Sequence, residues 1–333
     1  MLQSVRLGGA HPSYMDHVAG QLDPRRVVVS SFSYRAALLD DWDVLHVHWP
    51  ENLVRHRRKT RAWVRTALLV ALLCRVRFRG SGVVRTLHNV APHEEGGLVE
   101  RTVLTLLDRS VTCHVRLNEA THGRADTPMV TIPHGHYRAE MAGPSNGSHA
   151  AGRGLMFFGF LRPYKGIDAL VSAFADVSDP EERLVIAGEP ADEAMRTLVE
   201  RAAASDPRLE LHLGFLPDEE LAELVASVAL VVLPYKEIHN SGVVFAALSL
   251  ARPVLVPEND VTAALRREVG PEWVHGFHHP LEADHLAQAL AAAGSRDAGI
   301  RPDLGGRDWS AVAAQYTTVF EDCAGRAVQE DPR

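Results

Sequence analysis

Residues 155–174 read LMFFGFLRPYKGIDALVSAF, and they give the clearest indication of the fold class. Four apolar residues lead into a loop, GFLRPYKG (159–166), which is followed by a helical apolar pattern in IDALVSAF. A short apolar run that passes through a glycine-containing loop into a helix is typical of one unit of a parallel sheet. Similar units recur along the chain, so the sequence predicts an α/β protein whose parallel sheets are covered by helices on both faces.

The other segments alternate in the same way. The expected strands are short apolar or β-branched runs: 26–30, 44–48, 82–87, 129–133, 155–158, 183–187, 209–213, 229–233 and 253–256. The expected helices have apolar periodicity over a helical length: 60–76, 98–109, 166–176, 191–204, 218–227 and 242–251.

A change in composition predicts where the domains divide. Residues 138–154 are rich in Gly, Ser and Ala and have no apolar period, which favours a boundary there. We therefore expect a first domain over 1–145 and a second over 146–310. A last helix within 311–333 is expected to pack back on the first domain.

Composition excludes several classes of protein. The 333 residues are 46% apolar and 23% charged, which is typical of a folded chain of two domains. The longest uncharged apolar run, 67–74, is too short to span a bilayer, and the first residues lack the apolar core of a signal peptide. Three widely spaced cysteines exclude a disulfide framework. We expect a cytoplasmic protein.

Charge is unevenly distributed along the chain. Residues 1–150 hold 19 Lys and Arg against 13 Asp and Glu, whereas the remaining residues hold 16 against 29. Two halves of opposite sign agree with two domains, and they indicate that the first half meets an anionic partner.

Two cations in the 159–166 loop predict a site for an anion. Arg162 offers a planar guanidinium and Lys165 a point charge, and both suit a diphosphate near the start of a helix. Gly159 and Gly166 allow the backbone to approach such a ligand closely. Because ligands of parallel sheets bind at the carboxyl ends of the strands, we interpret this loop as a functional site rather than a solvated turn.

A second polar loop, PYKEIHNSG (234–242), lies between an apolar strand and an apolar helix. Asn240 or Ser241 would cap this helix in the ordinary way. The free N–H groups at the helix start, near His239 and Gly242, would also bind a phosphate or a sugar hydroxyl. The two roles are compatible.

Together these loops resemble the C-terminal half of GT-B glycosyltransferases, close to family 4. Three segments of the first half also resemble segments of this family: DVLHVHWPE (43–51), VVRTLHNVAPHE (83–94) and IPHG (132–135). The similarity covers most of the chain, in the order of the family. It implies two Rossmann-like domains that face each other across a cleft. It also implies transfer from a nucleotide sugar with retention at the anomeric carbon, with no essential metal or other cofactor.

The resemblance also assigns roles to residues. An Arg and a Lys after the first strand of the second domain hold the donor diphosphate in the family, which points to Arg162 and Lys165. The remaining donor-side residues lie in glycine-rich or helix-start loops: Gly8, Gly9, Gly159, His239, Asn240, Ser241 and Gly242. The acceptor-side residues all lie in the first domain: His48, Trp49, Glu51 and His134.

The expected catalytic residues are His88, Asn89 and Glu237. The resemblance places His88 and Asn89 facing the cleft, where a His would bond a sugar hydroxyl or the acceptor, or assist proton movement. The alternative for His88 is a buried histidine that bonds to a carbonyl. Many members of family 4 carry two glutamates eight residues apart, at positions that Ile238 and Ala246 occupy here. Glu237 replaces the first glutamate by a shift of one residue. The departure leaves open a non-catalytic nucleotide-sugar-binding homologue, or a GT-B epimerase or hydrolase.

Residues 55–79 suggest what the first domain meets. They hold nine Lys and Arg and no acid, together with Trp63 and the run ALLVALLC. Such a segment suits peripheral contact with an anionic membrane, a core helix with a solvated basic end, or the wall of an acceptor site. Nucleic acid is not expected, because aromatic residues are not interleaved with the basic ones.

The expected partners are therefore a UDP- or GDP-sugar donor and a sugar, lipid-linked or small-molecule acceptor. No metal site is expected. His46 and His48 alternate along one strand without a third ligand at a matching spacing, and the sequence Asp41-Trp42-Asp43 precedes its strand instead of ending it. No GxGxxG opens the first strand–helix unit, which argues against dinucleotide oxidoreduction.

Overall fold

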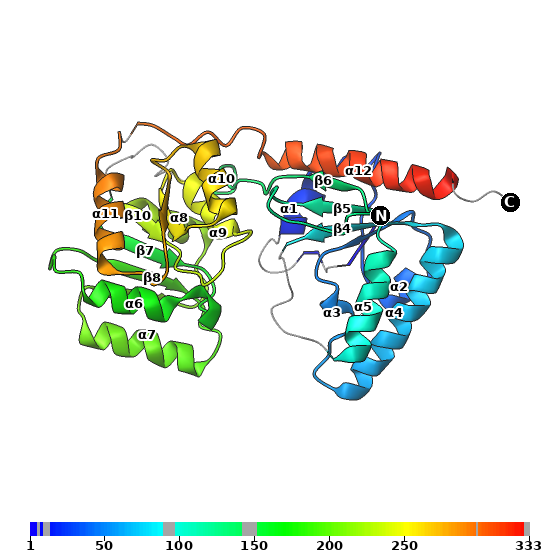
Figure 1. Ribbon diagram of the computed structural model, residues 1–333, viewed down its shortest axis with the longest axis horizontal. Coiled ribbons are helices and arrows are strands. Elements are labelled where there is room, and N and C mark those ends of the chain that lie inside the picture. Colours follow the sequence, from blue (N-terminus) through cyan, green and yellow to red (C-terminus); the bar gives the residue numbers. More distant parts are fainter. Residues whose placement is uncertain (5–6, 9–13, 89–96, 142–151, 298, 330–333) are drawn as a thin grey trace. The chain divides into compact units, whose positions relative to one another are not determined.

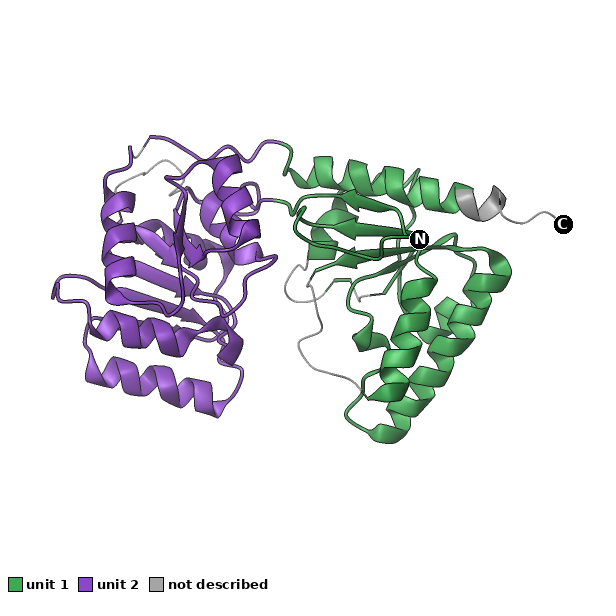
Figure 2. Cartoon of the chain, viewed as in Figure 1, with its two compact units in different colours: residues 1–135, 306–333 green, residues 136–305 purple. Residues whose placement is uncertain are grey.

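The computed structural model shows two parallel sheets, each covered by helices (Figure 1). It describes residues 1–4, 7–8, 14–88, 97–141, 152–297 and 299–329. The chain forms two compact units, one of Met1–Gly135 with Gly306–Arg333 and one of His136–Gly305 (Figure 2). The sequence predicts domain boundaries at 145 and 310, whereas the two units divide after Gly135 and after Gly305.

Unit 1 is built on six strands in the order β2-β1-β3-β4-β5-β6, and every pairing is parallel. The strands are β1 (Leu2–Gln3), β2 (Ser30–Ser31), β3 (Val44–Val47), β4 (Gly82–Leu87), β5 (Cys113–Arg116) and β6 (Met129–Thr131). The helices are α1 (Tyr14–Gln21), α2 (Tyr34–Leu39), α3 (Glu51–Val54), α4 (Lys59–Arg79), α5 (Leu98–Arg109) and α12 (Trp309–Gln329).

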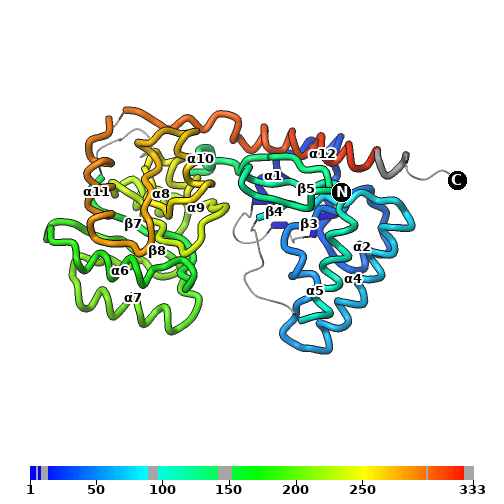
Figure 3. The backbone as a smooth tube through the Cα atoms, in the orientation of Figure 1, coloured from blue at the N-terminus to red at the C-terminus, as the bar shows by residue number. Residues whose placement is uncertain are grey.

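Two groups of helices cover the sheet of unit 1. Helices α1 and α12 pack on each other, and α12 lies against β4, while α2 and α5 each pack on α4 (Figure 3). The approach of α12 is close, because a Cβ at Gly82 would lie 2.8 Å from the carbonyl oxygen of Cys323. The last helix therefore belongs to the core of unit 1.

The prediction of a strand over residues 26–30 of unit 1 is wrong. Of residues 26–30, only Ser30 pairs in the sheet, in a two-residue strand at its edge. The side chain of Val28 is 70% exposed, and its carbonyl accepts a hydrogen bond of 2.9 Å from the terminal ammonium of Met1. A β-branched segment at the edge of a sheet has a neighbouring strand on one side only, so its side chains are not buried as those of a central strand are.

Unit 2 is built on six parallel strands in the order β12-β11-β10-β7-β8-β9. The strands are β7 (Leu155–Phe158), β8 (Leu184–Gly188), β9 (Leu209–Leu213), β10 (Leu230–Val232), β11 (Val254–Pro257) and β12 (Val274–Phe277). The helices are η2 (Pro163–Lys165), α6 (Ile167–Ala175), α7 (Glu193–Ser205), α8 (Asp218–Ser227), α9 (Gly242–Ser249), α10 (Asp260–Val269) and α11 (Ala283–Gly294).

The strand order of unit 2 indicates where a ligand binds. From β7 the chain proceeds to β8 and β9 on one side, and then returns to β10 on the other. Ligands of such sheets lie beyond the carboxyl ends of the two strands at this reversal. The loops after β7 and β10 are the two that the sequence singled out, so the parallel α/β fold is confirmed and its reversal point coincides with the predicted loops. Among the described helices of both units, none is long and apolar enough to cross a bilayer.

Candidate active site

Lys165 is the central residue of the candidate donor site in unit 2. Its side chain is only 7% exposed, and its Nζ lies 5.8 Å from the ring centre of Phe157 on β7 and 5.4 Å from that of Tyr235 after β10. Gly159 leaves room for the ammonium, because a Cβ there would lie 3.3 Å from Nζ. The two strands at the reversal point therefore enclose one buried cation.

Burial and the neighbouring guanidinium of Arg162 lower the pKa of Lys165 to about 8. Within the described part of the chain, no carboxylate or other hydrogen-bond acceptor contacts the ammonium. Arg162 itself is exposed, with its guanidinium 5.7 Å above the ring of Phe160. A buried ammonium without a counter-charge is unfavourable by itself, and it becomes favourable when an anion binds beside it.

The loops after β7 and β10 contact each other. Gly166 has φ +68, and a Cβ at this position would lie 2.1 Å from the carbonyl oxygen of Pro234. On the other side of the site, a Cβ at Gly159 would lie 3.4 Å from Cγ2 of Val243, in the first turn of α9. The structure thus brings Gly159 and Lys165 together with the start of α9, as a shared anion site requires.

The start of α9 is held by contacts other than an ordinary cap. Ser241 occupies the N-cap position, but its side chain makes no capping hydrogen bond. The side-chain amide of Asn259 donates to the carbonyl of Ile238 at 2.8 Å, which fixes the loop before the helix. His239 is half-buried, and burial lowers its pKa. Asn240 lies in the same loop.

The positions that carry glutamates in family 4 belong to the core of unit 2. Ile238 and Ala246 are 5% and 6% exposed and pack within the hydrophobic cluster around the sheet. Glu237 is exposed and precedes Ile238 in the loop. The side chains that the pattern would require to be carboxylates are therefore apolar packing residues here.

In unit 1, His48 and His88 form a directly bonded pair. They follow β3 and β4, which are neighbouring parallel strands, and His48 Nδ1 lies 2.6 Å from His88 Nε2. His48 is buried, whereas His88 is partly exposed and stacks on Trp49 with ring centres 4.5 Å apart. Burial, with a contribution from nearby His134, lowers the pKa of His88 to about 3, and burial holds the pKa of His48 well below its usual range. Both rings are therefore neutral near pH 7.

Tyr14 joins the predicted residues of unit 1 into one aromatic cluster. Its ring meets His88 edge-on at 5.5 Å and lies 5.0 Å from His134 and 5.4 Å from Trp309. Arg307 donates to the carbonyl of His134 at 3.0 Å. Tyr14 and Trp309 come from the two ends of the chain, and no motif in the sequence distinguished either from an ordinary packing aromatic.

The remaining predicted residues of unit 1 lie around this cluster or outside the described residues. Gly8 is exposed with φ +75, and its N–H donates to Asp16 Oδ1 at 2.7 Å. Glu51 is the first residue of α3 and is half-buried. Gly9 and Asn89 lie outside the described residues. In the described part of the chain, no group of three or more His, Cys, Asp or Glu side chains is placed to hold a metal.

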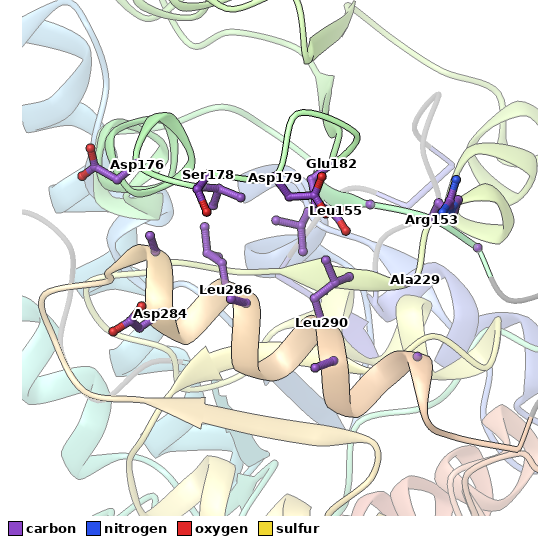
Figure 4. A pocket seen from close by; sticks show the side chains of 17 residues that line it. Arg153, Leu155, Asp176, Ser178, Asp179, Glu182, Ala229, Asp284, Leu286 and Leu290 are labelled. Carbon is purple, nitrogen blue, oxygen red and sulfur yellow. The ribbon is translucent and has the colours of Figure 1, made fainter.

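Unit 2 also contains a cavity of about 430 Å³. Figure 4 shows the side chains that line it. It is lined by Leu155 at the start of β7, by Asp176 and Glu182 before β8, and by Leu286 and Leu290 of α11. These are the amino ends of the strands, so the cavity is at the opposite edge of the sheet from Lys165.

The chain is similar to known glycosyltransferases. A family model described as glycosyl transferases group 1 matches residues 152–294. Over 304 residues the chain is 42% identical to a protein of Xanthomonas campestris pv. campestris described as a GDP-mannose:glycolipid 4-beta-D-mannosyltransferase. The aligned region covers 91% of this chain and 86% of that relative.

The same fold is found in solved structures of other proteins. Anabaena HepE in complex with UDP-glucose superposes with a TM-score of 0.62 at 15% identity, covering 98% of this chain and 99% of that one. An α,α-trehalose 6-phosphate synthase from Burkholderia multivorans superposes with a TM-score of 0.61 at 16% identity, covering 88% and 74%. At these identities the likeness concerns the fold.

Proposed function

We propose a specific reaction for this chain, which belongs to the group 1 glycosyl transferases and is a hexosyltransferase that uses a nucleotide sugar. The reaction is transfer of mannose from GDP-mannose to a hydroxyl of a lipid-linked saccharide. The observation that carries this proposal is the 42% identity, over nearly the whole chain, to a GDP-mannose:glycolipid mannosyltransferase. Such a relationship favours transfer over the non-catalytic, epimerase and hydrolase alternatives.

The donor site of unit 2 supplies the charge that the leaving group requires. When the glycosidic bond to phosphate breaks, negative charge develops on the diphosphate oxygens. The Lys165 ammonium, the Arg162 guanidinium and the N–H groups at the start of α9 would stabilise that charge without a metal ion. The buried, unpaired state of Lys165 supports this assignment, because the cation gains a partner only when the donor binds.

The stereochemistry of the product is a finer part of the proposal. The relative is named for a 4-beta-D-mannosyl product, and GDP-mannose carries mannose in the α configuration. A β-linked product therefore requires inversion at the anomeric carbon, in place of the retention that the resemblance to family 4 implies. We adopt inversion for this chain because its identity to that relative is the more direct relationship.

The proposed reaction is tested with purified protein, GDP-mannose and a short lipid-linked oligosaccharide, with UDP-glucose as the competing donor. Transfer from GDP-mannose in the presence of EDTA is expected, and the one-bond C–H coupling at the new anomeric centre should be that of a β-mannoside. An α-mannoside would reinstate retention. Transfer from UDP-glucose alone, or activity restored only by added Mg²⁺, would contradict the donor or the metal-free part of the proposal.

Helix α4 supports the proposal that the chain reaches a lipid-linked acceptor at a membrane surface. Leu69, Leu72 and Val76 face the core of unit 1. A second apolar stripe, which includes Trp63 and Phe78, lies on the exposed side of the same helix, where these two side chains are 62% and 88% exposed. A helix that is apolar on its core side and again on its outer side has more apolar surface than the fold buries.

The charges around the outer stripe indicate what covers it. Arg57, Arg58 and Arg61 at the start of α4, and Arg77 near its end, are exposed. They make no ion pair with any described residue, whereas Arg79 pairs with Asp41. Aromatic and aliphatic side chains flanked by free cations suit the interface of an anionic bilayer. We propose that α4 lies on such a surface.

The double substitution Trp63→Ser with Phe78→Ser is expected to reduce binding to vesicles that contain phosphatidylglycerol by about tenfold or more, because it removes the two most exposed aromatic side chains of α4. Co-sedimentation with these vesicles, and with neutral phosphatidylcholine vesicles, measures the effect. Ile300→Ser removes an exposed apolar side chain from unit 2 and serves as the control. Equal binding by all three proteins, or equal binding to both lipids, would contradict the docking role of α4.

The pKa of Lys165 predicts how donor use depends on pH. Below about pH 8 the side chain is an ammonium and binds the diphosphate, and above that value it becomes neutral. The kcat/KM for GDP-mannose, which reports the free enzyme, is therefore expected to fall as pH rises through about 8. Arg162→Gln removes a neighbouring positive charge, so it should raise the pKa of Lys165 and move this fall to higher pH. A profile that is flat from pH 7 to 10 would argue against an essential Lys165 ammonium.

A further inference from the structure

The bonded pair of His48 and His88 holds a single proton between its facing nitrogens. At 2.6 Å, one of His48 Nδ1 and His88 Nε2 must donate and the other must accept. Both rings are neutral, so each carries one N–H. The direction of this hydrogen bond consequently fixes the tautomer of both rings at once.

The second nitrogen of His48 decides the direction. His48 Nε2 is buried and has no hydrogen-bond partner in the protein. If His88 donated, the proton of His48 would be on Nε2, where this N–H would have no acceptor. A buried N–H without an acceptor costs more free energy than a buried lone pair without a donor. If His48 donates through Nδ1, only a lone pair is left without a partner. The second arrangement is the more stable one.

The neighbours of the two rings prevent either from turning away. His88 stacks on Trp49 and meets the edge of Tyr14. His48 lies with its ring centre 4.3 Å from that of His46, whose Nε2 is 2.8 Å from Thr86 Oγ1. Packing on these sides keeps the nitrogens of the pair aligned.

We propose that His48 is a positioning residue that donates from Nδ1 to His88 Nε2 and holds His88 as the neutral tautomer protonated on Nδ1. In that tautomer His88 carries its N–H on Nδ1, so this nitrogen is a hydrogen-bond donor and not a proton acceptor. His48 itself is buried and does not touch the acceptor. The inference rests on the proposed function, in which His88 meets a sugar hydroxyl or the acceptor.

The tautomer is measured directly by ¹⁵N NMR of the histidine rings in the free protein, with His88→Gln used to assign the His88 signals. The expected result is a protonated Nδ1 and an unprotonated Nε2 on His88 at pH 7. Protonation on Nε2 would overturn the proposal. This measurement needs no substrate, so it is independent of whether GDP-mannose is the donor.

Two substitutions separate positioning from packing. His48→Asn places an amide N–H near the position of Nδ1 and keeps a donor toward His88, whereas His48→Phe keeps a ring and has no donor. We expect His48→Phe to lower kcat about tenfold with an unchanged KM for the donor, the scale of one oriented hydrogen bond. His48→Asn is expected to stay within about threefold of the wild type.

Thermal unfolding of each variant provides the control. Loss of kcat that follows the loss of Tm in both variants would reduce His48 to a packing residue and overturn the proposal. A wild-type protein that transfers no mannose would instead contradict the proposed function, and the NMR result would still decide the direction of the hydrogen bond.

Discussion

Replacing Lys165 with Met is expected to lower kcat/KM for GDP-mannose by a hundredfold or more and to raise the stability of the free protein. The ammonium is the buried cation of the proposed donor site, and a charge-assisted bond to a diphosphate is among the strongest single contacts available to a ligand. Met keeps the length of the side chain and its packing between Phe157 and Tyr235. Steady-state kinetics and thermal unfolding of the same preparation measure the two effects.

The gain in stability follows from the pKa. Burial lowers the pKa of Lys165 from 10.5 to about 8, which corresponds to about 3 kcal/mol of cost for folding with the ammonium charged. The gain from Met should be full below pH 8 and should disappear above pH 10.5, where the lysine is neutral in both states. Lys236→Met, an exposed lysine of the same unit, is the control and should change stability little. A destabilised Lys165→Met with normal kinetics would refute the diphosphate assignment.

Replacing Gly166 with Ala is expected to destabilise unit 2 by about 2–4 kcal/mol and to lower donor affinity. Gly166 has φ +68, a conformation that costs an alanine about 1 kcal/mol, and its new Cβ would lie 2.1 Å from the Pro234 carbonyl oxygen. Because the clash is with backbone, relief requires the loops after β7 and β10 to move apart. Equilibrium unfolding in urea and GDP binding by calorimetry measure the two consequences.

Gly294→Ala is the matched control for this substitution. Gly294 is the last residue of α11, and nothing lies within 4 Å of a Cβ placed there. Ala is the better helix former, so this variant should be neutral or more stable than the wild type by up to about 1 kcal/mol. If Gly166→Ala were as stable as Gly294→Ala, the contact between the two loops would not be what holds the donor site together.

Helices and strands could be predicted from the sequence where a single segment has a clear apolar pattern. Strand β4, strand β9 and helices α5 and α8 have the bounds that the apolar pattern predicts. Strand β1 has only two residues, and β5 contains His114 and Arg116, so neither shows a clear period. The short β1 nevertheless lies between β2 and β3, because tertiary pairing and not local pattern places it.

The donor loop shows how far motif reasoning reaches. The glycines and cations of 159–166 predict an anion site from their order alone, since a strand, a tight loop and a helix start follow directly from residue type. The burial of Lys165 and its place between two aromatic rings came only from the fold, because Tyr235 approaches it from a different strand.

Residues that are close in the chain are sufficient to predict the fold class, the two loops of the proposed donor site and the basic character of α4. The packing of the fold is needed to show that His48 contacts His88, and that Tyr14 and Trp309 join the same cluster. These contacts join the ends of neighbouring strands and the two ends of the chain. The periodic pattern of a sequence predicts which side chains are buried. It does not predict which buried side chains contact each other, because those contacts depend on how the helices and strands pack.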